Sequence, residues 1–131
     1  MQISAKIESR FHSQETVMQT EDIAKRITIP VKPTGYGSAV NGGELLLLAL
    51  AVCFCNDLYR EAAKRKIAVS AVAVACTAEF GEDGEPGRDF RYTARVSADA
   101  SPEVIEELIR ATDRLAEVHN TLRKGISITL E

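Results

Sequence analysis

The first third of the chain alternates hydrophobic and polar positions, which is the two-residue period of a half-buried strand. Three segments show this pattern: residues 3–7, 15–20 and 27–31. The first two are close enough to form a hairpin. Pro30 and Pro33 remove backbone donors, so we expect the third strand to lie at an edge or to end there.

The pattern changes to that of a long helix after residue 41. Asn41 and Glu44 have the spacing of a capping box, in which each side chain satisfies a backbone group at the start of a helix. Residues 45–66 contain no proline or glycine, and residues 45–55 are apolar all round the helix. A helix of this kind must be enclosed on every side. One sheet and one further helix leave part of it uncovered, so we expect an intimate homodimer.

The rest of the chain predicts two strands, a second helix and a last short strand. Ser101 and Pro102 are typical of a helix cap and first turn, and Gly125 ends the helical pattern. The expected elements are strands at 67–80 and 90–98, a turn at 81–87, a helix from 102 to 124 and a strand at 126–130. The order is β-β-β-α-β-β-α-β, an α+β fold. No linker or repeat divides it, so we expect one domain over residues 1–131.

Composition narrows the classes of function. The chain has 131 residues, with 16 basic and 19 acidic side chains and a formal net charge of −3. No basic stripe is present, which argues against binding to nucleic acid or to an anionic membrane surface. The apolar run at 45–55 is too short to span a bilayer, which needs about 20 residues. Three cysteines and no secretory signal indicate a reducing cytoplasm.

The Cys53-Phe54-Cys55 segment of the central helix is the most suggestive site for chemistry. Two residues along a helix are rotated by about 200°, so these thiols point to opposite sides and do not form a disulfide. The alternative is that they are small hydrophobic core residues. The cysteines and histidines lack the spacing of a metal site, and the glycines at 35–43 lack the spacing of a phosphate-binding loop. We therefore expect no metal and no cofactor.

Two segments resemble the OsmC/Ohr family, the osmotically induced and organic-hydroperoxide-resistance proteins. The stretch from Asn41 to Phe54 is similar to the start of that family's central helix, which carries a Cys-Phe pair. The stretch from Ala116 to Leu122 is similar to the family's Cys-Pro-Val-x-x-x-Leu segment. The resemblance implies an intertwined α+β homodimer in which long central helices lie between sheets.

The resemblance also implies a reaction. The family's peroxidases attack an organic hydroperoxide with one thiol and resolve the sulfenic acid with a second thiol. Cys53 matches the attacking thiol, but Ala116 stands at the resolving position and Glu117 at the proline that follows it. An external thiol would then have to complete the cycle. Cys76 could replace the missing thiol only if it faces Cys53, and Cys55 has no counterpart.

The attacking thiol needs a cation nearby, because burial in an apolar helix raises the pKa of a cysteine. The family uses an arginine from an N-terminal turn, held by the glutamate that opens the central helix. Glu44 matches that glutamate, and Arg10 is the candidate arginine. Simple capping is the alternative for Glu44, and a solvated hairpin charge is the alternative for Arg10.

His119 is a second candidate partner of the thiol. It follows Ala116 by three residues, so both lie on nearly the same helix face. If that face meets Cys53, the imidazole could share a proton with the thiol. The alternative is a buried histidine bonded to backbone or to Asp113.

Two functions of different classes follow. In the first, Cys53 reduces a hydroperoxide or attacks another electrophile, and an external thiol regenerates it. In the second, a non-catalytic homodimer binds a small hydrophobic molecule, and Cys53 is a packing residue or a redox sensor.

Overall fold

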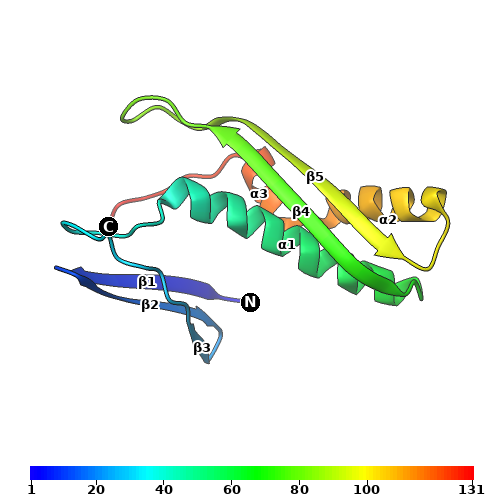
Figure 1. The fold of residues 1–131 in the computed structure, drawn as a ribbon, viewed down its shortest axis with the longest axis horizontal. Coiled ribbons are helices and arrows are strands. Elements are labelled where there is room, and N and C mark those ends of the chain that lie inside the picture. The colour runs from blue at the N-terminus through cyan, green and yellow to red at the C-terminus, as the bar shows by residue number, and fades with distance from the viewer. The chain divides into compact units, whose positions relative to one another are not determined.

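A computed structural model describes all 131 residues of the chain. The chain folds as two compact units, residues 1–45 and residues 46–131, and each is described by itself. Both strands and helices are present (Figure 1), so the α+β fold class is confirmed. The expectation of a single domain stays a prediction.

The N-terminal unit is a three-stranded antiparallel sheet. Its strands are β1 (Ile3–Arg10), β2 (Ser13–Thr20) and β3 (Ile23–Arg26), in the order β1-β2-β3. Two tight turns connect them, with positive φ angles of 57° at His12 and 49° at Glu21.

The third strand lies earlier than the alternating residues 27–31 predict, and that prediction is wrong. The turn at Glu21 reverses the chain at once, so Ile23 already pairs with Thr20. Residues 27–29 are instead held by side chains of β2: Thr16 donates to the carbonyl of Ile27 and Gln14 to that of Ile29. A proline has no backbone N–H to donate, so a regular strand cannot continue through Pro30. The bonds from Thr16 and Gln14 use only the carbonyls of this segment and are therefore still possible.

The second unit contains the helices and a two-stranded sheet. Its elements are α1 (Gly42–Lys64), which begins at the boundary of the units, β4 (Val69–Glu79), β5 (Arg88–Ala98), α2 (Pro102–Leu115) and α3 (Glu117–Lys124). β4 and β5 are antiparallel, with Val72 opposite Val96 and Cys76 opposite Tyr92. Helices α1 and α2 lie against this sheet (Figure 1).

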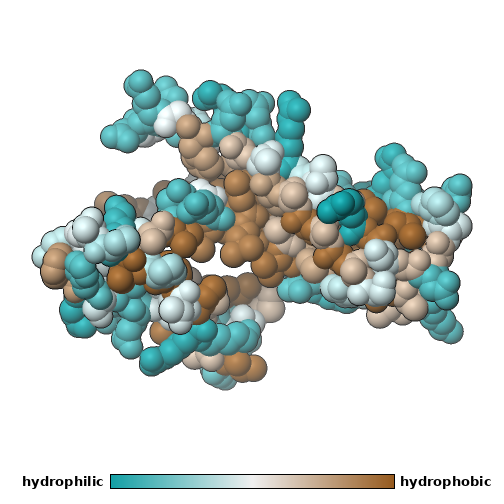
Figure 2. Space-filling model, viewed as in Figure 1, coloured by the Kyte–Doolittle hydropathy of each residue, from teal (hydrophilic) through white to brown (hydrophobic).

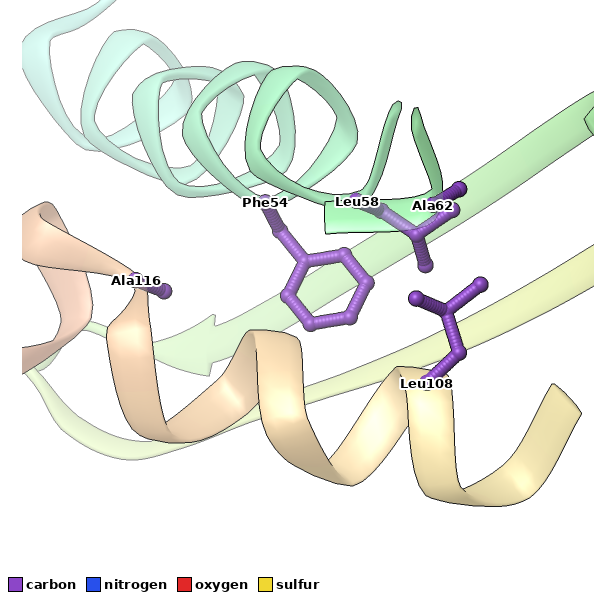
Figure 3. Close-up of a cluster of buried hydrophobic side chains, with 5 residues drawn as sticks. All are labelled: Phe54, Leu58, Ala62, Leu108 and Ala116. Atoms are coloured by element: carbon purple, nitrogen blue, oxygen red, sulfur yellow. The ribbon is translucent and has the colours of Figure 1, made fainter. Parts of the chain in front are cut away.

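The core forms where α1 meets α2 over the sheet. Phe54, Leu58 and Ala62 follow one another at four-residue spacing on α1, so they share one face of the helix. They pack with Leu108 of α2 and with Ala116 between α2 and α3 (Figure 3). Half-buried sheet residues complete this core: Val69, Val72, Val74, Tyr92, Ala94 and Val96.

The C-terminal part differs from the prediction in two respects. The expected single helix is broken at Ala116, whose ψ of 106° is extended, and it becomes α2 and α3. The expected strand at 126–130 does not form. Its residues have no neighbouring strand to pair with in the chain, and their side chains are exposed. A strand is stabilised by pairing rather than by its own pattern.

The chain leaves many large hydrophobic side chains at the surface, and several gather over α1 (Figure 2). Leu48 and Val52, from the apolar half of α1, are 53% and 50% exposed. By length and composition alone, α1 could span a membrane, and no other helix could. Core helices of soluble proteins meet the same measure, and α1 contributes Phe54 and Leu58 to the core.

Candidate functional site

Cys53 lies half-buried on α1 and faces the start of α3. Its Sγ donates to Oδ2 of Asp57 at 3.5 Å, one helical turn along α1. The backbone amides of Val118 and Glu117 also interact with the sulfur. Burial raises the pKa of the Cys53 thiol, and the Asp57 carboxylate adds to this, whereas the two amides act in the opposite direction. The net effect keeps the sulfur protonated at neutral pH.

The break at Ala116 creates the environment of the sulfur. The first amides of a helix have no partner within the helix. Ala116, the cap residue of α3, offers no side-chain acceptor for them. Two of these amides, of Glu117 and Val118, act on the sulfur of Cys53 and lower the pKa of its thiol. The break that frees them is at the buried residue that matches the family's resolving cysteine.

Asp57 is held in place from its other side. Its Oδ1 forms an ion pair with Nη2 of Arg60 at 3.0 Å, while Oδ2 faces the thiol. The Asp57 side chain is only 11% exposed. The charged group that contacts Cys53 is thus an anion, and the arginine lies beyond it.

His119 lies in the same unit but does not bond to Cys53. The residue is 5% exposed, and neither ring nitrogen has a hydrogen-bond partner. Its ring centroid is 4.7 Å from that of Tyr92 and 6.1 Å from that of Phe54. Burial lowers the pKa of His119, and the charge of Arg123 lowers it further. The imidazole is therefore neutral at pH 7.

A polar network lies beside His119. The Tyr92 hydroxyl donates to Asp113, and Arg123 Nη2 donates to Oδ1 of the same carboxylate at 2.6 Å. Burial raises the pKa of Tyr92, as does its bond to Asp113. Burial alone would raise the pKa of Asp113 too, but the donors Tyr92 and Arg123 hold it below its ordinary value. Asp113 accepts both bonds on Oδ1 and does not bond to the imidazole.

His119 and Tyr92 line a half-open cleft of about 410 Å³. The cleft combines apolar and cationic walls, and its other lining residues are Leu50, Gly87, Phe90, Arg91, Leu122 and Arg123. A cleft of this composition accommodates a small molecule with an apolar body.

Glu44 and Arg10 are both found in the N-terminal unit. Glu44 accepts from the amide of Asn41 through Oε2, and its own amide donates to Oδ1 of Asn41, both at 2.8 Å. The capping box is therefore confirmed, and Glu44 makes no ion pair. Arg10 ends β1, is exposed and has no carboxylate partner.

None of the three cysteines is in a disulfide, and a resolving role for Cys76 stays a prediction. Cys53, Cys55 and Cys76 are all free and half-buried, with Cys76 on β4. No group of histidine, cysteine, aspartate or glutamate side chains has the arrangement of a metal site.

Sequence reasoning missed Asp57 as the partner of the thiol. The signal was present, because residues four apart share a helix face. It also missed the network around Tyr92, which depends on the packing of β5 against α2 and α3. No local pattern reports that packing.

Comparison with known proteins agrees with this fold. A search of curated protein sequences found no match. Among solved structures, an OsmC-like protein from Mycoplasma pneumoniae is 17% identical with a TM-score of 0.65, over 93% of this chain and 86% of that one. The organic hydroperoxide resistance protein OhrB of Bacillus subtilis is 20% identical with a TM-score of 0.55, over 98% and 96%. An organic hydroperoxide resistance protein OsmC from Legionella pneumophila is 15% identical with a TM-score of 0.60, over 94% and 90%.

At these identities the neighbours show a shared fold alone. The sequence adds the decisive comparison, because the family model for OsmC-like proteins matches residues 35–131. That range contains α1 with Cys53 and the whole second unit. The chain therefore belongs to the OsmC family.

Proposed function

We propose that the protein reduces organic hydroperoxides with Cys53 as its only reacting thiol. The position of the Cys53 sulfur carries this proposal. It is half-buried at the start of α3, it contacts a carboxylate, and it forms no disulfide. Solved neighbours with hydroperoxide resistance in their names support the substrate class.

The reaction balances with one protein thiol and an external reductant. The sulfur attacks the distal oxygen of R–O–O–H, the O–O bond breaks, and Cys53 sulfenic acid and the alcohol R–OH result. One small thiol then forms a mixed disulfide with Cys53 and releases water. A second small thiol displaces Cys53, which returns to the reduced state as a small-molecule disulfide leaves.

Single-turnover oxidation of the reduced protein tests the proposal. Cumene hydroperoxide is added in the absence of other thiols, and sulfenic acid is trapped with dimedone and located by mass spectrometry. We expect the adduct on Cys53, with turnover restored by dithiothreitol. Cys53→Ser should abolish turnover, whereas Cys55→Ser and Cys76→Ser should retain it. Trapping on another cysteine, or on none, would contradict the proposal.

A second candidate function is the binding of a small molecule without chemistry. The unpartnered imidazole of His119 in the wall of the 410 Å³ cleft favours it. A buried polar group without a partner costs about 1–3 kcal/mol, which a ligand that bonds to it would recover. The charged groups in the wall are Arg91 and Arg123, so an apolar anion fits best.

Titration with octanoate tests this second function, with 1-octanol as the uncharged control. In the NMR spectrum we expect octanoate to shift the imidazole signals of His119 and leave those of His12 unchanged. Equal shifts of both histidines, or none, would contradict binding in the cleft.

A further inference from the structure

The group that contacts the reacting thiol is a carboxylate rather than a cation. Asp57 Oδ2 lies 3.5 Å from Cys53 Sγ, on the same face of α1. Because the carboxylate is negative, it disfavours a thiolate beside it. A site that depends on a preformed thiolate would place a positive group there. The arrangement instead suits a thiol that loses its proton only during the reaction.

We propose that Asp57 accepts the proton of Cys53 as the sulfur attacks the peroxide, a role that rests on the proposed function. The S–O bond forms while the O–O bond breaks, and the thiol proton moves to Oδ2 of Asp57. The leaving alkoxide then takes this proton and departs as the alcohol. The distal oxygen keeps its own hydrogen and becomes the hydroxyl of the sulfenic acid.

The surroundings leave Asp57 suited to this role. Arg60 bonds to Oδ1 and not to Oδ2, so it fixes the carboxylate while the second oxygen stays directed at the sulfur. The side chain is 11% exposed, and this limits competition from water. The amides of Val118 and Glu117 stabilise negative charge on the sulfur as the proton leaves.

No other side chain is placed to take the proton. His119 on α3 is neutral but has no hydrogen-bond partner, including the thiol. Asp113 is bonded to Tyr92 and Arg123. The groups whose charge acts on this region are Asp57, Arg60, Asp113 and Arg123, and only Asp57 bonds to the sulfur.

Asp57→Asn separates proton transfer from a mere electrostatic effect, because the two predict opposite changes. Alkylation of Cys53 by iodoacetamide follows the amount of thiolate, so its rate at pH 7.5 should rise several-fold when the carboxylate is removed. Sulfenic acid formation with cumene hydroperoxide should instead fall at least about tenfold, because general bases contribute about 10²–10⁴-fold to the rate of a proton transfer. If both rates rise together, Asp57 only suppresses the thiolate and the proposal is wrong.

Two variants control for folding. Glu61→Gln removes the next carboxylate on this face of α1, which pairs with Lys64, and should change neither rate. Asp57→Glu keeps a carboxylate and should recover part of the peroxide rate lost in Asp57→Asn. If Asp57→Glu is as slow as Asp57→Asn, the effect is structural and the proposal is wrong.

The same data distinguish failure of the proposed function. If the wild-type protein is alkylated at Cys53 but forms no sulfenic acid with cumene hydroperoxide, the peroxidase function is wrong. The proposed proton transfer to Asp57 is then wrong as well. If the wild-type protein is oxidised and Asp57→Asn is oxidised equally fast, the function stands and only the role of Asp57 is wrong.

Discussion

The burial of His119 changes how the stability of the protein depends on pH. Folding places the imidazole among Phe54 and Tyr92, without a hydrogen-bond partner. Burial first, and the charge of Arg123 second, hold the pKa of His119 below its ordinary value of 6.5. In the unfolded chain the imidazole has that ordinary value. Below about pH 6.5 the unfolded state therefore binds more protons than the folded state.

We expect the free energy of unfolding to fall as the pH falls below 6.5, with His119 responsible. Urea titrations at pH 7.5, 6.5 and 5.5 measure it. His119→Phe should make the change between pH 7.5 and 5.5 smaller. His12→Asn is the matched control, since His12 is exposed in a turn of positive φ that asparagine tolerates. An equal pH dependence in His119→Phe and the wild type would contradict the assignment.

At the scale of elements, two roles are open to Glu44 at the start of α1: capping the helix, or holding an arginine near the thiol. The capping box with Asn41 needs an oxygen acceptor, and glutamine supplies one without the charge. A carboxylate that holds an arginine near the thiol needs the charge. The structure shows the first role.

We expect Asn41→Ala to lower the free energy of unfolding by about 1 kcal/mol and Glu44→Gln to leave it nearly unchanged. Sulfenic acid formation on Cys53 should also be unchanged in Glu44→Gln. Urea unfolding and dimedone trapping measure the two quantities. A tenfold slower oxidation in Glu44→Gln at wild-type stability would show instead that the charge of Glu44 serves the thiol.

The packing of α2 against α1 makes a further prediction. Leu108 is fully buried against Phe54 and Leu58, whereas Leu115 on the same helix is 54% exposed. Leu108→Ala should lower the free energy of unfolding by about 2–5 kcal/mol, because it leaves a cavity in the core. Leu115→Ala should cost less than about 1 kcal/mol. Urea unfolding measures both losses of free energy. Similar losses in Leu108→Ala and Leu115→Ala would show that the core is not at the contact of Leu108 with α1.

The sequence predicted the elements whose signals are local. The capping residues Asn41 and Glu44 and the alternating positions of β4 and β5 are read directly from spacing. The break at Ala116 was not predicted, because its neighbours are acceptable inside a helix. The family proline that aligns with Glu117 was the missed signal, since proline favours the first position of a helix.

The site was less accessible to sequence reasoning than the fold. Cys53 followed from the family resemblance, but its partner Asp57 did not, although their spacing places them on one face. Whether His119 points toward a thiol or between aromatic rings depends on side chains from three elements. Residues 126–130 alternate like a strand but pair with no other strand of the chain, and a local pattern does not show whether a partner strand exists.

At the scale of the whole molecule, the chain exposes large apolar side chains on several elements. They include Leu48 and Val52 of α1, which are 53% and 50% exposed, and the alternating Ile126, Ile128 and Leu130, which are 59%, 91% and 99% exposed. Hydrophobic patches of this kind mark interaction surfaces.

We propose that a second copy of the chain covers the apolar half of α1, and sedimentation equilibrium tests this. The wild-type protein should sediment as a dimer of about twice 14.3 kDa. Leu48→Arg should shift it toward monomer, because an arginine placed in an apolar interface loses its hydration without gaining a partner. Leu115→Arg is the matched control, since Leu115 is 54% exposed against 53% for Leu48 but lies on α2. A monomeric wild-type protein, or equal dissociation in both variants, would show that this half of α1 is not the interface.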